Sequence, residues 1–154
     1  MDIIQETHKW TANILLIIFI YSSMMWYWIA NDSNKIDNIS FRAFIFLEKL
    51  VSGVMFLLGI GVLASNPEWL NKDGVLIKMM LGIITIGFVH LCSAKTKQYL
   101  DSKNKNTQQI KIINILRAIS IILLMTVYTT GTMIRAFNDH SLIEEVKKIH
   151  NNEN

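Results

Sequence analysis

The chain has 154 residues and a formal net charge of +3, and 51% of its residues are hydrophobic while only 18% are charged. Such a low charged fraction argues against an ordinary soluble domain, and such a small net charge predicts no nucleic-acid partner. The one cysteine, Cys92, excludes an intrachain disulfide. The chain has no Cys/His ligand spacing, so the sequence predicts no metal site.

Four apolar runs dominate the chain, at about residues 10–30, 44–64, 74–94 and 112–134. Each is close to the ~20 residues that a helix needs to cross a bilayer. Short polar connections separate them, and the runs largely lack the polar face that a soluble helix should show. We therefore predict an all-α fold: an integral membrane four-helix bundle with short loops over residues 1–138, surrounded by the lipid bilayer.

The first apolar run is interpreted as a retained span rather than a signal peptide. Asp2 and Glu6 make the segment before it acidic. The run is also too long for a signal peptide, and no A-x-A cleavage site follows it. Because nothing resembles a transit peptide, a bacterial inner membrane is the predicted location.

The distribution of lysine and arginine in the flanks predicts the orientation. Four spans place both termini on one side, together with Lys9, Lys72, Arg135, Lys147 and Lys148. The other side carries Lys35, Arg42, Lys95, Lys97, Lys103, Lys105 and Lys111. The connection over residues 95–111 is the most basic and lies closest to its helix ends. We therefore predict that this connection is cytoplasmic and that both termini lie outside the cytoplasm.

The polar tail, residues 139–154, is predicted to contain a short amphipathic C-terminal helix. Ser141 and Glu144 have the spacing of a capping box. The apolar positions of the tail are Leu142, Val146 and Ile149, which form one stripe. Such a helix would lie on the membrane surface or on a partner, and a solvated terminus is the alternative.

Ionisable side chains inside the spans are the main candidates for function, because charges at membrane depth are costly and usually face the bundle interior. Glu48, His90 and Arg117 are predicted to form an intramembrane polar layer near the basic connections, with Glu48 and Arg117 as an ion pair. Two interpretations stay open: a polar cluster that fixes helix register, or a proton path or binding site for an acidic group. Lys78 lies twelve residues from His90, roughly 18 Å along a helix, so they cannot share one small site.

Histidines between spans suggest haem as a candidate cofactor, because membrane four-helix bundles can hold haem between facing side chains. Two axial ligands must lie at one depth on opposing helices. His8 and His90 are predicted to lie near opposite membrane faces and fail this condition. The alternatives are His90 with Met24 or Met25, and His8 alone or with Met133.

The segment from residue 44 to residue 95 resembles the small four-helix membrane proteins related to the HemJ-type protoporphyrinogen IX oxidase and the CopD copper-resistance proteins. The shared features are FLLGIGVL, the loop NPEWLNKDG, and LIKMMLGIITIGFVHLCSAK with its early lysine and late histidine. His8 matches a family histidine at the start of the first helix. The resemblance implies haem or porphyrin handling by His8, Lys78 and His90. The family's L-P-R segment and N-E-x-P start have no counterpart here.

Three functions are consistent with these patterns, and whether the protein is an enzyme stays open. The first is a small multi-pass membrane protein associated with haem, porphyrin or redox chemistry. The second is a non-enzymatic subunit or assembly partner of a larger membrane complex, as a homo-oligomer or with another membrane subunit. The third is a small transporter or metal-handling protein that uses Glu48, His90 and Arg117.

Overall fold

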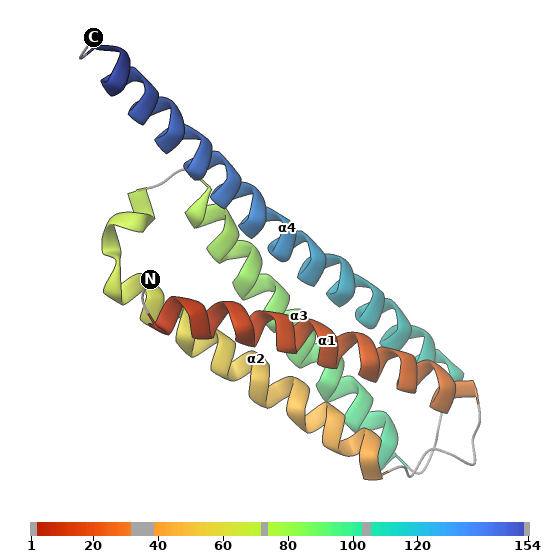
Figure 1. Ribbon diagram of the computed structural model, residues 1–154. Coiled ribbons are helices and arrows are strands. Elements are labelled where there is room, and N and C mark those ends of the chain that lie inside the picture. The colour runs from red at the N-terminus through yellow and green to blue at the C-terminus, as the bar shows by residue number, and fades with distance from the viewer. Residues whose placement is uncertain (1–2, 32–38, 72–73, 103–105, 153–154) are drawn as a thin grey trace.

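The computed structural model describes residues 3–31, 39–71, 74–102 and 106–152, and side chains are described up to residue 133 (Figure 1). The elements are α1 (Ile3–Asn31), α2 (Ile39–Ser65), the short 3-10 helix η2 (Pro67–Asn71), α3 (Val75–Asp101) and α4 (Thr107–Asn152). This part of the chain contains no strand, which confirms the all-α prediction. Four helical segments are long and apolar enough to cross a membrane: Ile3–Ala30, Ile39–Ser65, Val75–Asp101 and Thr107–Met133. The protein is a small multi-pass membrane protein.

The helices are longer than the apolar runs that predicted them. α1 begins at Ile3 rather than near residue 10, and α3 continues to Asp101 rather than ending near residue 94. A helix of 27 residues, the length of α2 and of α3, rises about 40 Å. That length matches the hydrocarbon core together with its headgroup regions. Hydropathy therefore marks only the part of each helix that lies in hydrocarbon.

The turn between α2 and α3 is built from local backbone chemistry. The side-chain amide of Asn66 donates to the carbonyl of Val62 at 3.1 Å and caps the end of α2. Pro67 then begins η2, and Gly74 precedes α3 with a φ of 84°. Glycine adopts this left-handed conformation without the steric cost that a side chain would add. Asn66, η2 and Gly74 thus lie between α2 and α3.

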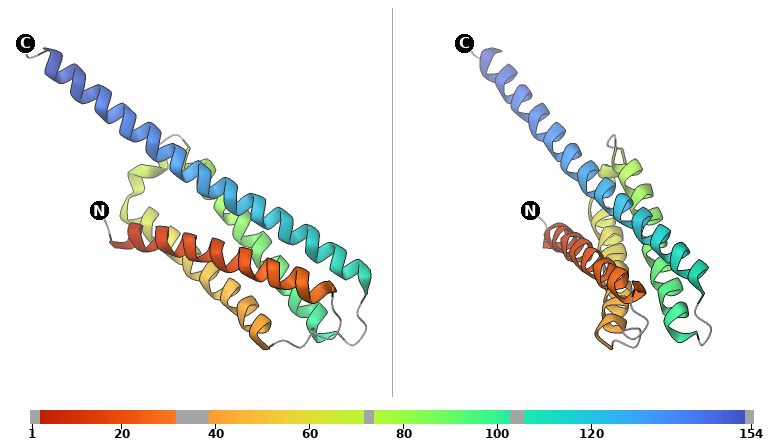
Figure 2. Two further views of the ribbon diagram at one scale, coloured as in Figure 1. Left: turned by 45° about the vertical axis from the view of Figure 1, so that its right-hand side comes forward. Right: turned by 90° about the vertical axis from the view of Figure 1, so that its right-hand side faces the viewer.

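The four helices run antiparallel to their neighbours in chain order (Figures 1 and 2). The carboxyl ends of α1 and α3 and the amino ends of α2 and α4 lie at one end, called the basic end here. The amino terminus and η2 lie at the other. α1 and α4 are close at the basic end and diverge away from it, while α4 continues well past the bundle (Figure 2). The predicted C-terminal helix falls in this last part of α4, and its predicted amphipathic face lies outside the described side chains.

Two apolar clusters form the core on either side of a polar layer. The cluster nearer the basic end consists of Trp26, Ile29, Phe41, Ile45, Tyr99, Leu100 and Ile113. The second consists of Leu15, Phe19, Met55, Val89, Cys92 and Leu124. Trp26 anchors the first cluster, because its indole N–H donates to Asn114 Oδ1 at 2.7 Å and its ring meets Tyr99 edge-on at 5.4 Å.

Burial is unequal along the bundle. The basic half comprises residues 15–31, 39–55, 85–102 and 107–124, and the far half comprises residues 3–14, 56–65, 74–84 and 125–133. Every helix contributes several buried side chains to the basic half. In the far half, Val62 is the one buried side chain among those described. The helices are therefore tightly packed at one end and loosely associated at the other.

Candidate functional site

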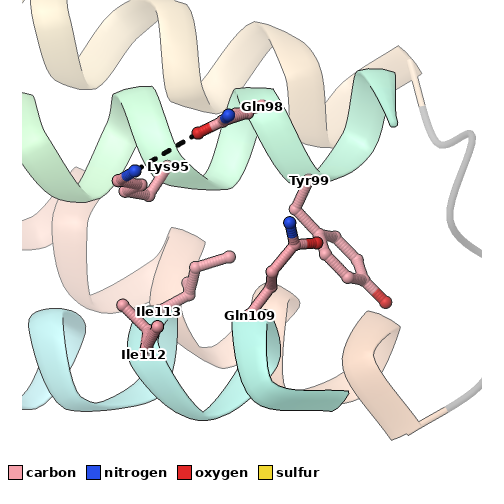
Figure 3. A pocket seen from close by; sticks show the side chains of 6 residues that line it. All are labelled: Lys95, Gln98, Tyr99, Gln109, Ile112 and Ile113. Atoms are coloured by element: carbon pink, nitrogen blue, oxygen red, sulfur yellow. Dashed lines mark hydrogen bonds between the residues drawn. The ribbon is translucent and has the colours of Figure 1, made fainter. Parts of the chain in front are cut away.

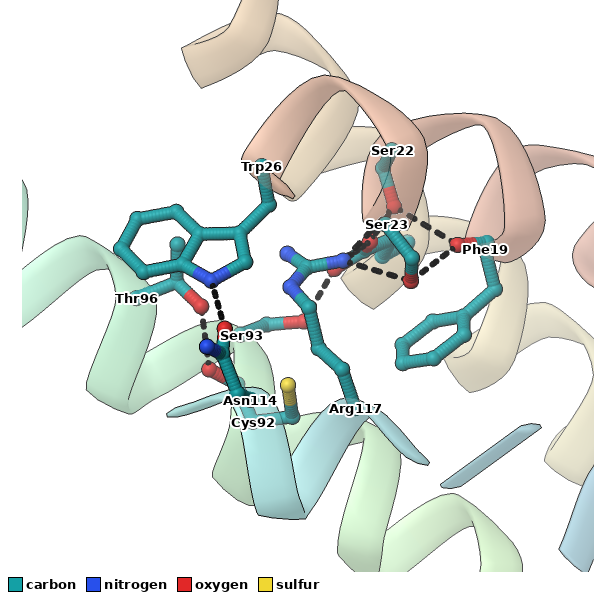
Figure 4. A network of polar contacts seen from close by, with 10 residues as sticks. Phe19, Ser22, Ser23, Trp26, Cys92, Ser93, Thr96, Asn114 and Arg117 are labelled. Atoms are coloured by element: carbon teal, nitrogen blue, oxygen red, sulfur yellow. Dashed lines mark hydrogen bonds and ion pairs between the residues drawn. The ribbon is translucent and has the colours of Figure 1, made fainter. Parts of the chain in front are cut away.

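Glu48 is the centre of a buried polar cluster to which all four helices contribute. Figure 4 labels its partners Ser22, Ser93 and Arg117. The Glu48 side chain belongs to α2 and is 0% exposed. Its Oε1 accepts hydrogen bonds from the hydroxyl of Ser22 on α1 and from Arg117 Nη1 on α4, the latter at 3.2 Å. Its Oε2 accepts from the hydroxyl of Ser93 on α3 at 2.6 Å. One carboxylate thus connects the four helices.

Arg117 compensates the charge of Glu48 and is itself only 3% exposed. Its Nη1 also donates to Ser22 Oγ at 3.0 Å and to Ser23 Oγ at 3.1 Å. The guanidinium lies 5.5 Å from the ring centre of Phe19 and 5.7 Å from that of Phe41. Aromatic faces at this distance attract a cation. The Glu48–Arg117 ion pair expected from the sequence is therefore present, supported by hydroxyls and aromatic rings.

His90 lies beside this cluster but joins it indirectly. Its Nε2 is 3.1 Å from Oγ of Ser52, which lies one helical turn after Glu48 on α2. The Ser52 hydroxyl donates to the backbone carbonyl of Lys49 at 3.0 Å. The Ser52 hydroxyl therefore connects the His90 ring on α3 to the backbone of α2. The structure brings His90 near Glu48 and Arg117 without a direct bond to either.

The serines that complete the cluster, Ser22, Ser23 and Ser93, are functional candidates that the sequence reasoning missed. A signal for them existed, because SSMMW places two hydroxyls inside an otherwise apolar run. Hydroxyls between membrane helices commonly bond across the interface. Their partners could not be read from the sequence, since a serine in a helix can equally bond its own backbone. Ser23 does so, donating to Phe19 O at 2.7 Å.

His8 and Lys78, the residues implied by the family resemblance, both lie in the far half. Each lies against a glycine of a neighbouring helix. A Cβ built on Gly59 of α2 would be 3.4 Å from His8 Cε1, and one built on Gly131 of α4 would be 2.9 Å from Lys78 Nζ. These glycines allow the two side chains to approach the neighbouring backbone closely. The structure thus brings His8 and Lys78 to the same end of the bundle.

The two spanning histidines lie against α2 at different positions along that helix. His8 meets α2 at Gly59 and His90 meets it at Ser52. Seven residues of helix separate these positions by about 10 Å. The two rings do not share one level. The assignment of the two histidines to opposite membrane faces stays a prediction.

The described residues do not bring two of the predicted haem ligands together. Met24 and Met133 are among the exposed hydrophobic side chains, and Met25 packs against the cluster around Trp26. His90 Nε2 is already within hydrogen-bonding distance of Ser52. A pair of facing axial ligands at one depth is therefore not formed by these side chains, and haem binding stays a prediction.

Two surface cavities lie at the basic end rather than at the polar cluster. One, of about 230 Å³, opens between α3 and α4 (Figure 3). Its lining consists of Lys95, Gln98, Tyr99, Gln109, Ile112 and Ile113. The other, of about 150 Å³, lies between α2 and α3. Neither cavity is lined by Glu48, His90 or Arg117, so neither gives a ligand access to the ion pair.

Comparison with known protein families, with curated proteins and with solved structures found no match to this chain. The resemblance to the HemJ and CopD group therefore stays a prediction from sequence features.

Proposed function

We propose that this protein is a non-enzymatic subunit or assembly partner of a larger membrane complex. The observation that carries the proposal is the unequal packing of its two halves. The basic half buries side chains from all four helices, while the far half buries a single described side chain. Protein interiors are close-packed, so a loosely associated half in lipid is a surface that another helix can complete.

The buried ion pair fits a structural role in this proposal. Both carboxylate oxygens of Glu48 are occupied by donors from three other helices of the same chain. A substrate would have to reach a carboxylate that is 0% exposed and is already bonded to Ser22, Ser93 and Arg117. We therefore assign the cluster to holding helix register, the better attested use of buried polar groups.

The chemistry of the far half suits contact with another membrane helix. Small residues and hydroxyls allow close approach and bonding between helices in lipid. A Cβ on Gly82 would have nothing within 4 Å, which leaves open space there. The exposed threonines of α4 in this half are Thr126, Thr129 and Thr132. Their hydroxyls donate to carbonyls of their own helix. These donors are therefore satisfied even where the side chains face lipid.

Photo-crosslinking at two matched positions tests this proposal. Met133 in the far half and Ile115 in the basic half are 65% and 58% exposed. Eighteen residues, or five turns, separate them, so they project from the same face of α4. A crosslinker at Met133 should give an adduct with one defined membrane protein or with a second copy of the chain, and a crosslinker at Ile115 should give lipid adducts only. Protein adducts of equal yield at both positions, or at neither, would contradict the proposal.

We also propose the orientation in which the basic end faces the cytoplasm of a bacterial inner membrane. The support is the exposed cation set at that end, which includes Lys95, Lys97 and Lys111. Cytoplasmic loops carry an excess of such residues. Thiol labelling of a cysteine introduced in place of Lys97 should require a membrane-permeant reagent in intact cells. Labelling by an impermeant reagent would reverse the assignment.

A haem- or porphyrin-associated role is the second candidate, favoured by one observation. His8 and Lys78, which the resemblance implicates, lie in the same loosely packed half, each against a glycine. Pure protein in detergent should then show a Soret band that His8→Ala weakens. A colourless protein that binds no added haem would remove this candidate and leave the subunit proposal intact, because the crosslinking result does not depend on haem.

A further inference from the structure

The groove between α2 and α3 at the basic end combines cations with an apolar wall. Its lining consists of Arg42, Ile45, Phe46, Lys49, Lys97 and Leu100. Its volume of about 150 Å³ is well below the ~300–1,000 Å³ of pockets that enclose a small molecule. A site of this size holds the charged group of a larger ligand whose remainder lies outside the groove.

The cations of this groove are not fully neutralised by the protein. Arg42 Nη1 pairs with Asp101 at 2.6 Å, and Nη2 donates to the Leu100 carbonyl at 3.4 Å. Among the residues that the structure describes, Lys49 and Lys97 form no ion pair. The two ammonium groups therefore give the groove a net positive charge, contributed from both of its walls.

The depth of Lys49 makes an anionic partner favourable there. Lys49 lies ten residues after the start of α2 at Ile39, about 15 Å along the helix, and is half-buried. A lysine at that position extends its chain along the helix to bring the ammonium to the headgroup level. Lys97 lines the same groove from α3, one turn beyond Ser93, whose hydroxyl donates to Glu48 on α2.

The groove also has an apolar continuation toward the bilayer centre. Phe46 is exposed beside Ile45. Gly53 follows Lys49 by one turn on the same face of α2, and a Cβ at Gly53 would meet nothing within 4 Å. This arrangement leaves room for a hydrocarbon chain to lie along α2. A phosphate with an attached acyl chain matches the groove, while a free phosphate would use only its cations.

We propose that this groove binds an anionic phospholipid, with its phosphate on Lys49 and Lys97 and one acyl chain along Phe46 and Gly53. Basic pockets between membrane helices are recognised sites for anionic headgroups. Bound lipid would bridge α2 and α3 and stabilise the basic half. Each lysine near the membrane surface contributes about a fivefold change in affinity for such a lipid.

Thermal unfolding of the full chain in mixed micelles tests the proposal. The buried Cys92 provides the signal, because a thiol-reactive fluorophore labels it on unfolding. Phosphatidylglycerol should raise the unfolding midpoint, whereas phosphatidylcholine alone, or phosphatidylcholine with inorganic phosphate, should not. Lys97→Gln should raise about fivefold the phosphatidylglycerol concentration that is needed for half of the full midpoint shift. Lys111→Gln is the matched control, because it removes one exposed lysine at the same end but outside the groove. This variant should leave the phosphatidylglycerol concentration dependence unchanged.

Three results would overturn the proposal. An equal loss of phosphatidylglycerol affinity in Lys97→Gln and Lys111→Gln would show that the lipid is attracted to the basic surface in general and not to the groove. A full shift with inorganic phosphate would show a free-anion site, and an equal shift with phosphatidylcholine would show that the headgroup charge is irrelevant. If Lys49→Gln fails to insert, Lys97→Gln still decides the matter, because Lys97 is exposed and removes no core contact. Native mass spectra of the wild type, with phosphatidylglycerol retained over phosphatidylcholine, give an independent readout.

Discussion

The basic half and the far half of this bundle are built from the same four helices but are held together differently. In the basic half, Glu48 and Arg117 bind the helices through hydroxyls, and Trp26 locks α1 to α4. In the far half, the close approaches involve His8 and Lys78 against glycines. Lipid provides no hydrophobic force that drives helices together. Polar bonds between helices therefore distinguish the basic half from the far half.

Removal of Arg117 should have the largest effect on stability. Arg117→Leu leaves the carboxylate of Glu48 buried without its counter-ion, which costs about 3–5 kcal/mol in comparable pairs. Arg42→Leu is the matched control, because its pair with Asp101 is partly exposed, and such pairs contribute about 0–1 kcal/mol. Unfolding in mixed micelles of increasing denaturing detergent measures both. Similar losses from the two variants would refute the distinction between a buried and a surface pair.

Ser93→Ala should have an intermediate effect. It removes the donor on Oε2 of Glu48, and an unsatisfied buried acceptor costs about 1–3 kcal/mol. Ser23→Ala serves as the control, since Arg117 retains Ser22 and Glu48 as partners when Ser23 is lost. The same detergent titration should rank Ser93→Ala as the more damaging change. The reverse ranking would show that the hydrogen bond between Ser23 and Arg117 contributes more to stability than the bond between Ser93 and Glu48.

Gly131→Ala should have the smallest effect of the three. The added Cβ would lie 2.9 Å from Lys78 Nζ, but this is the end of a flexible side chain that can move. We expect a loss below about 1 kcal/mol, partly offset by the better helix propensity of alanine. A loss as large as that of Ser93→Ala would show that the far half is as tightly packed as the basic half.

The architecture and the ion pair could be predicted from the sequence because both follow from a large energetic penalty. A run of about 20 apolar residues has few alternatives to a membrane span. Charges such as Glu48 and Arg117 inside spans must face the interior and pair. Neither inference needed knowledge of side-chain contacts.

The side-chain partners and the unequal packing of the two halves could not be predicted, because they depend on small differences in free energy between alternative contacts. Ser22 bonds Glu48, whereas Thr129 bonds only its own helix, and nothing local separates the two cases. α1 begins at Ile3, seven residues before its apolar run, because polar residues at a helix end can stay helical. The loose far half follows from the divergence of α1 and α4 (Figure 2), which helical periodicity does not predict.

A double-mutant cycle on Glu48 and Arg117 tests the central claim, that their buried bond holds the basic half together. Unfolding free energies would be measured for Glu48→Met, Arg117→Met and the double variant in the same micelles. The double variant should be less destabilised than the sum of the single variants by at least about 1 kcal/mol, because removing both charges leaves neither unpaired. Effects that add within about 0.5 kcal/mol would show that the two side chains do not stabilise the bundle as a pair.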